Sequence, residues 1–149
     1  MNPGDIFELD GESGPVLVQL THRHGTSSDV VRVLPRGDAR DLEAVARQEA
    51  LMVAMVPLSG AIESGRLKAR RLGSAAIPEA ARAFPTFRMA IRDKKDGVRG
   101  DVAYWWFWDG EGLVYSADPP AESEHMPYRE VLSVDEFLRR ARQLMSEIG

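Results

Sequence analysis

Two histidines, His22 and His24, form the residue pair in this chain whose spacing is best suited to chemistry. In a strand they lie on one face, so both imidazoles can reach one metal ion. A third ligand is required, and His125 is the only other histidine among the 149 residues. No serine elbow and no carboxylate pair of recognisable spacing accompanies them. A metal-dependent enzyme using His22 and His24 is one open alternative, beside two imidazoles that face solvent at a strand end.

The composition removes several other kinds of site. The chain contains no cysteine, so disulfides, thiolate nucleophiles and cysteine-ligated zinc are excluded. Its formal net charge of −4 disfavours general nucleic-acid binding, which needs a basic surface. The N-terminus has no basic stretch followed by an apolar run, and the longest apolar stretch, residues 50–58, is too short to span a membrane. We therefore expect a cytoplasmic protein without a cofactor and without membrane association.

Residues 102–108, Val-Ala-Tyr-Trp-Trp-Phe-Trp, hold all three tryptophans of the chain. We predict that this segment is a strand, in which Trp106 and Trp108 share one face and Trp105 lies on the other. Such a strand is either covered on both faces as core or leaves one face for a partner. Tryptophan is enriched among the residues that anchor interfaces. Trp105 and Trp108 are therefore candidate partner-binding residues.

An acidic turn follows the tryptophans directly. Asp109 and Glu111 flank Gly110, which is a pattern that ordinary turn chemistry explains. The functional alternative is an acidic edge that recognises Lys or Arg on a partner, which steers association more than it sets affinity. Asp109 and Glu111 accordingly complete the predicted partner-binding set.

Strands must position these residues, and hydrophobic alternation predicts them in two groups. Each group is a run of three short segments separated by turn residues, over residues 4–9, 15–21 and 29–34, and then 86–93, 102–108 and 113–115. A continuous apolar run at 51–56 suits a buried strand. The alternating basic and apolar residues 66–72 suit an edge strand protected by its charges. We predict an α+β fold in which two antiparallel β-meanders form a twisted sheet or a partly open barrel.

Helical spacing appears in two segments. Residues 41–50 change from strand to helix periodicity, and Asp38 or Asp41 can cap the start. Near the C-terminus, Ser133 and Glu136 form a Ser-x-x-Glu capping box that opens an amphipathic helix. We expect this helix to pack on the sheet through Phe137, Leu138 and Leu144. Nothing marks a linker, so a single domain over residues 1–149 is predicted.

The opening residues 4–9, Gly-Asp-Ile-Phe-Glu-Leu, resemble the start of bacterial toxin-immunity proteins of the immunity-protein-26 kind. The resemblance covers the opening third of the chain and implies a small cytoplasmic α+β protein. A second resemblance, to a set of uncharacterised bacterial proteins, implies no activity. It is carried by residues 18–22, 31–35, 84–85 and 105–111. Neither resemblance brings catalytic residues.

The sequence thus favours a non-enzymatic protein-binding module of the toxin-immunity type. It would neutralise a toxin domain by covering its active surface, and the residues expected to bind are Trp105, Trp108, Asp109 and Glu111. Two alternatives stay open, namely a small-ligand-binding module with a tryptophan-lined pocket and the metal-dependent enzyme described above. The oligomeric state and the identity of the partner do not follow from the residues.

Overall fold

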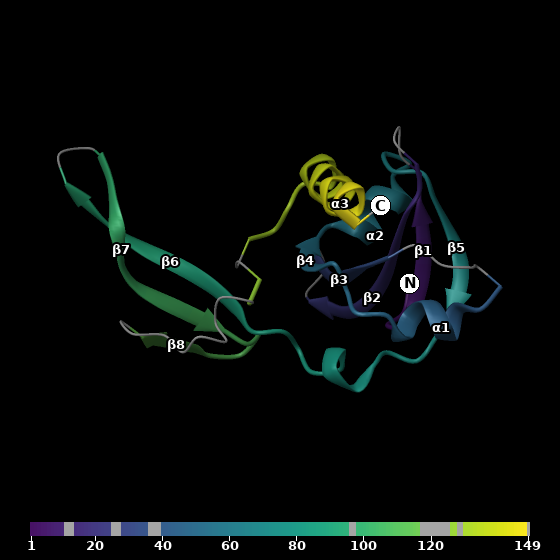
Figure 1. Cartoon of the computed structure of the whole chain (residues 1–149), viewed down its shortest axis with the longest axis horizontal. Coiled ribbons are helices and arrows are strands. Elements are labelled where there is room, and N and C mark those ends of the chain that lie inside the picture. Colours follow the sequence, from purple (N-terminus) through teal and green to yellow (C-terminus); the bar gives the residue numbers. More distant parts are fainter. Residues whose placement is uncertain are drawn as a thin grey trace. The chain divides into compact units, whose positions relative to one another are not determined.

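The chain divides into two compact units, one formed by Met1–Ala83 with Glu130–Gly149 and the other by Phe84–Arg129 (Figure 1). The computed structural model describes residues 1–10, 14–24, 28–35, 40–95, 98–116, 126–127 and 130–148. These residues form eight strands in two antiparallel sheets together with helices, so the predicted α+β class is confirmed. The single domain over residues 1–149 stays a prediction, because compactness does not decide whether each unit folds independently.

The first unit is built on a five-stranded antiparallel sheet, here called sheet A, with the strand order β4-β3-β2-β1-β5. Its strands are β1 (Asp5–Leu9), β2 (Val16–His24), β3 (Ser28–Leu34), β4 (Met52–Val56) and β5 (Ala69–Ser74). The first three form the predicted meander, and the runs at 51–56 and 66–72 supply the other two. Because the order is linear, sheet A is open and does not close into a barrel.

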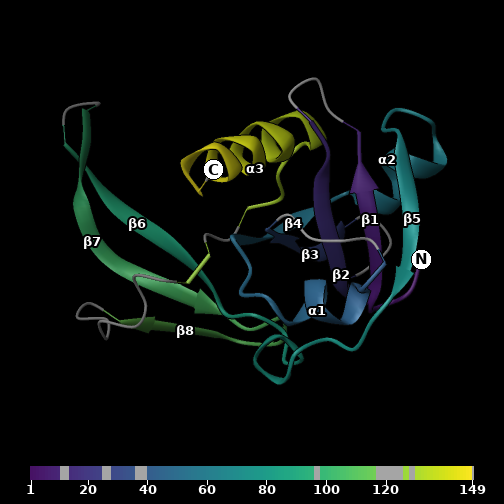
Figure 2. The same cartoon turned by 45° about the vertical axis from the view of Figure 1, so that its right-hand side comes forward.

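One face of sheet A carries the main hydrophobic core. Val16, Val18 and Leu20 alternate along β2 and are fully buried on this face, as their spacing predicts. Helix α3 (Val134–Ile148) covers them through Phe137, Leu138 and Ala141, and α2 (Leu58–Glu63) adds to the same core (Figure 2).

The third predicted packing residue of this helix, Leu144, is partly buried but is not among the residues that pack against the main core. Met145 packs against the core in its place. It lies four residues beyond Ala141, so the two share one face of the helix.

The opposite face of sheet A is covered by α1 (Leu42–Arg47). The helix begins at Asp41, whose side chain accepts a hydrogen bond from the backbone N–H of Ala44 at 3.1 Å, as the capping prediction expects. It ends at Arg47, earlier than predicted, because Gln48 is already extended. Val45 joins a small second core that also contains Leu17, Leu34 and Leu72.

A buried arginine ties α1 to sheet A. Arg32 Nε donates to Gln19 Oε1 at 2.8 Å, and both residues are inaccessible or nearly so. The same guanidinium donates to the carbonyl oxygens of Ala46 and Gln48 at the end of α1. Three acceptors therefore satisfy a cation that would otherwise be costly to bury. The first unit is a scaffold with both faces of its sheet filled.

The second unit contains a three-stranded antiparallel sheet, here called sheet B, with the order β6-β7-β8. Its strands are β6 (Phe87–Lys95), β7 (Val98–Trp108) and β8 (Leu113–Ser116), and the 3₁₀ turn η1 (Glu79–Ala81) lies in the chain before them. This is the predicted second meander, and the tryptophan segment is extended as expected. The two meanders form separate sheets.

Candidate functional site

The register of β7, the central strand of sheet B, decides which tryptophans share a face. Trp106 lies opposite Tyr115 of β8, with ring centroids 5.5 Å apart. Trp108 lies opposite Leu113 of β8 and Phe87 of β6. One face of the sheet, here called the aromatic face, therefore gathers Phe87, Met89, Trp106, Trp108, Leu113 and Tyr115.

Trp108 belongs to a cluster that holds the end of the hairpin. Its ring centroid is 5.5 Å from that of Phe84 and 5.9 Å from that of Phe87, which is fully buried. Gly110 closes against the cluster with φ +95°, and a Cβ there would come within 2.8 Å of Phe84. Trp108 is therefore partly exposed, but its ring packs against Phe84 and Phe87.

Trp105 lies on the opposite face of β7. The guanidinium carbon of Arg88 is 5.1 Å from the Trp105 ring centroid, which is the geometry of a cation–π contact. The indole is only partly buried. Trp105 therefore keeps exposed aromatic area, as a partner-binding residue requires.

The acidic turn after β7 is organised by Asp109. Its Oδ1 accepts hydrogen bonds from the backbone N–H groups of Gly112 at 2.9 Å and Glu111 at 3.0 Å. These bonds hold the pKa of the Asp109 carboxyl below its ordinary value. Both Asp109 and Glu111 are exposed. Asp109 shapes the turn, while its charge remains directed to solvent beside β8.

The largest exposed apolar feature on the described residues is β8 itself, which sequence reasoning did not select as a site. Leu113 is 50% exposed, Val114 67% and Tyr115 65%. β8 pairs with β7 on one side and is the last strand of sheet B among the described residues. Three consecutive apolar residues in a short strand after the acidic turn were the available signal. Together, β8, Trp105 and the acidic turn form what we call the β8 edge surface.

The two candidate metal ligands are placed differently from expectation. Both nitrogens of His22 have protein partners, since Nδ1 lies 2.9 Å from Thr21 Oγ1 and Nε2 lies 2.8 Å from the carbonyl oxygen of Arg82. The side chain of His24 and all of His125 lie outside the described residues. Within the described part of the chain, no group of three or more histidines and carboxylates is placed to hold a metal ion. The metal-dependent alternative stays a prediction.

Comparisons with family models, with curated proteins and with solved structures found no match to this chain. The resemblance to immunity proteins therefore stays a prediction. Across the part of the chain that the structure describes, no helix has both the length and the apolar composition needed to cross a membrane.

Proposed function

We propose that this chain is a non-enzymatic protein-binding module whose docking surface is the β8 edge surface. The observation that carries the proposal is the exposure of Leu113, Val114 and Tyr115 on the last described strand of a sheet. An edge strand presents backbone donors and acceptors along its outer side, and an exposed apolar edge is a template for another chain. A partner strand added to β8 would gain main-chain hydrogen bonds and apolar contacts together.

Charge selects the kind of partner. Asp109 and Glu111 lie exposed at the start of β8, and the whole chain is acidic with a net charge of −4. A partner segment with apolar residues flanked by Lys or Arg complements this arrangement. Such a complex would bury about 1,200–2,000 Å² in total if it is stable, which is more than β8 alone offers. Trp105 on the adjacent strand extends the contact area.

The toxin-immunity role is the specific form of this proposal. Its support is the resemblance of residues 4–9 and the acidic character of the β8 edge surface. An immunity protein that covers an active surface needs an exposed docking edge. Sheet B, with its exposed strand β8, offers such an edge.

The proposal is tested by capturing the partner from the native host with the tagged full chain at native expression. We compare it with Val114→Lys, which places a charge on the edge of β8 as natural edge strands do. Arg70→Ala on β5, also an exposed strand residue, is the matched control. We expect one stoichiometric protein that binds at least about tenfold more weakly to Val114→Lys and normally to Arg70→Ala.

Two results contradict the proposal. A chain that stays alone in the host removes the binding function. A partner held equally by wild type and by Val114→Lys removes the β8 edge surface as its docking site. If that partner is a toxin domain, loss of its inhibition in Val114→Lys supports the immunity role, and unchanged inhibition contradicts it.

A further inference from the structure

A cavity in the first unit, remote in sequence from sheet B, carries an inference of its own. It has a volume of about 470 Å³ and is wide open to solvent, so it would enclose only part of a ligand. It is bounded by α3, by the residue that follows β1 and by the chain that leads into β5. No tryptophan lines it. Its lining residues are Asp10, Gly65, Arg66, Leu67, Lys68, Val134, Asp135, Leu138 and Arg142.

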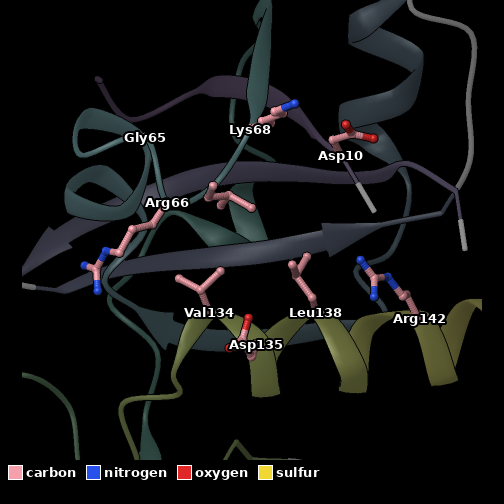
Figure 3. A pocket seen from close by; sticks show the side chains of 9 residues that line it. Asp10, Gly65, Arg66, Lys68, Val134, Asp135, Leu138 and Arg142 are labelled. Atoms are coloured by element: carbon pink, nitrogen blue, oxygen red, sulfur yellow. The ribbon is translucent and has the colours of Figure 1, made fainter. Parts of the chain in front are cut away.

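The floor of the cavity is apolar and fixed. Leu67 and Leu138 are buried members of the main core, and Val134 packs against the same core. Val134, Leu138 and Arg142 follow one another at intervals of four residues, so they rise in a row from one side of α3 (Figure 3). The row runs from an apolar end to a cationic end. It therefore has the polarity of a site for an amphiphilic molecule.

The charges around the cavity are not neutralised by one another. Three cations, Arg66, Lys68 and Arg142, outnumber the two carboxylates by one. Within the described part of the chain, none of the five charged side chains forms an ion pair, although Arg66 Nε donates to Ser64 Oγ at 3.2 Å. An excess of one unpaired cation favours an anion with a single charge.

Arg142 marks the place of that anion. Its Nε is buried and has no hydrogen-bond acceptor among the described residues. A buried donor without an acceptor is unfavourable, and a carboxylate is the group that a guanidinium binds best, with two parallel hydrogen bonds. By contrast, Arg139 and Arg140 on the same helix are bonded to Glu136. Arg142 thus lacks the acceptors that Arg139 and Arg140 have, and because its Nε is out of solvent, a carboxylate would bind through its terminal guanidinium nitrogens.

We propose that this cavity binds a monocarboxylate with an apolar body. The carboxylate lies at Arg142, the apolar body lies along Leu138, Val134 and Leu67, and Lys68 adds positive potential from the opposite wall. Asp10 and Asp135 disfavour a second negative charge. The same chemistry is offered by a free small acid and by the C-terminal residue of a peptide. The site is independent of the β8 edge surface, and neither proposal needs the other.

The test is a titration followed by NMR of the methyl groups of Leu67, Val134 and Leu138. The probes are hexanoate for a free acid and N-acetylleucine for a peptide C-terminus, with hexanol and N-acetylleucine amide as uncharged controls. We expect at least one acid to shift these methyl signals at millimolar concentration and to bind more tightly than its uncharged control and than adipate, a dicarboxylate. The tighter of the two acids identifies the source of the carboxylate.

Variants separate this site from unspecific binding. Arg142→Gln and, independently, Lys68→Gln are expected to weaken acid binding about tenfold, which corresponds to 1.4 kcal/mol. Arg139→Gln, on the same helix but outside the cavity lining, should leave binding unchanged. The proposal is overturned if neither acid shifts the three methyl signals, if adipate binds more tightly than hexanoate, or if both cavity variants bind as wild type does.

Discussion

One of the two edge strands of sheet A, β5, is opposite in character to the edge strand β8 of sheet B. β5 of sheet A presents Arg70 and Arg71, whose guanidinium groups lie 3.3 Å from Glu8 and 3.1 Å from Asp5. β8 of sheet B presents three apolar side chains that are each at least half exposed, Leu113, Val114 and Tyr115. One chain therefore contains both a charged edge and an apolar edge.

Under the proposed function, this difference assigns the contact surface to sheet B. Charges on an edge strand discourage addition of another strand, whereas an exposed apolar edge permits it. The Arg70–Glu8 pair is largely exposed and contributes little to stability, so edge protection explains Arg70 better, whereas Arg71 also neutralises the buried carboxylate of Asp5. Sheet A also has both faces filled, while Trp105, Trp106 and Trp108 in sheet B are all partly exposed. If the proposed binding function holds, sheet B is the sheet that contacts the partner, and sheet A is the packed core of the first unit.

The largest expected effect compares one aromatic residue from each unit. Phe137→Ala empties a fully buried position of the main core and should lower the free energy of unfolding by about 3–5 kcal/mol. Tyr115→Ala removes a ring that is 65% exposed and should change it by no more than about 0.5 kcal/mol. Urea unfolding followed by circular dichroism measures both. Similar losses for the two variants would contradict the division into scaffold and contact surface.

A smaller effect is expected at the turn that supports β8. Gly110→Ala forces a side chain into φ +95° and against the ring of Phe84, so it should destabilise sheet B by about 1–3 kcal/mol. Gly112→Ala is the matched control, because a Cβ there meets nothing within 4 Å. All three tryptophans lie in β7, so their fluorescence during unfolding reports on this sheet. Equal stability of the two variants would show that neither the φ of Gly110 nor its contact with Phe84 limits the stability of sheet B.

The contrast between β5 and β8 can be reduced by substitution on β5. The variant Arg70→Val makes β5 more apolar, as β8 is, and keeps Arg71 in place beside the buried carboxylate of Asp5. We expect the onset of self-association to move to about tenfold lower protein concentration, as measured by light scattering. Arg47→Val, which also breaks an exposed ion pair but lies on α1, should not move it. Unchanged association of Arg70→Val would mean that Arg70 does not protect this edge.

The smallest expected effect is electrostatic and lies in α3. Hydrogen bonds from Arg139, and then from Arg140, lower the pKa of Glu136 to about 2. Because the pKa is lowered in the folded chain, the stabilisation is present above about pH 4.5 and is lost as the pH falls towards 2. Thermal unfolding of wild type and Glu136→Gln should differ at neutral pH and converge at the acid end of this window. If wild type and Glu136→Gln differ in thermal stability by the same amount at every pH, the stabilisation does not come from the ionised carboxylate of Glu136.

Much of the fold was predictable because its strands have a strict period of two. In β2 the alternation of Val16 and Val18 with Leu17 and Gln19 identified both the strand and its core face. Boundaries were less predictable where tertiary contacts decide them. Residues 66–68 have strand periodicity but line the cavity, and β5 begins only at Ala69.

Only the serine half of the predicted capping box at the start of α3 is observed. Ser133 Oγ accepts a hydrogen bond from the Glu136 N–H at 3.2 Å. The Glu136 carboxylate accepts from Arg139 and Arg140 instead. Two guanidinium groups within one helical turn compete for the carboxylate, and a motif of four residues does not include them.

The candidate site was only partly predictable. The tryptophans, the strand that bears them and the acidic turn all follow from residue types and spacing. The position of β8 at the edge of sheet B does not, because strand order is a tertiary property that local periodicity leaves open. For the same reason Trp108 was predicted to bind a partner although it packs with Phe84 and Phe87.

The most direct test of the scaffold and contact assignment is amide hydrogen exchange of the full chain, alone and bound to its captured partner. We expect slower exchange on binding in β8 and in the acidic turn, with no change in β5. Slower exchange in β5, or a complex that leaves exchange in β8 unchanged, would contradict this assignment.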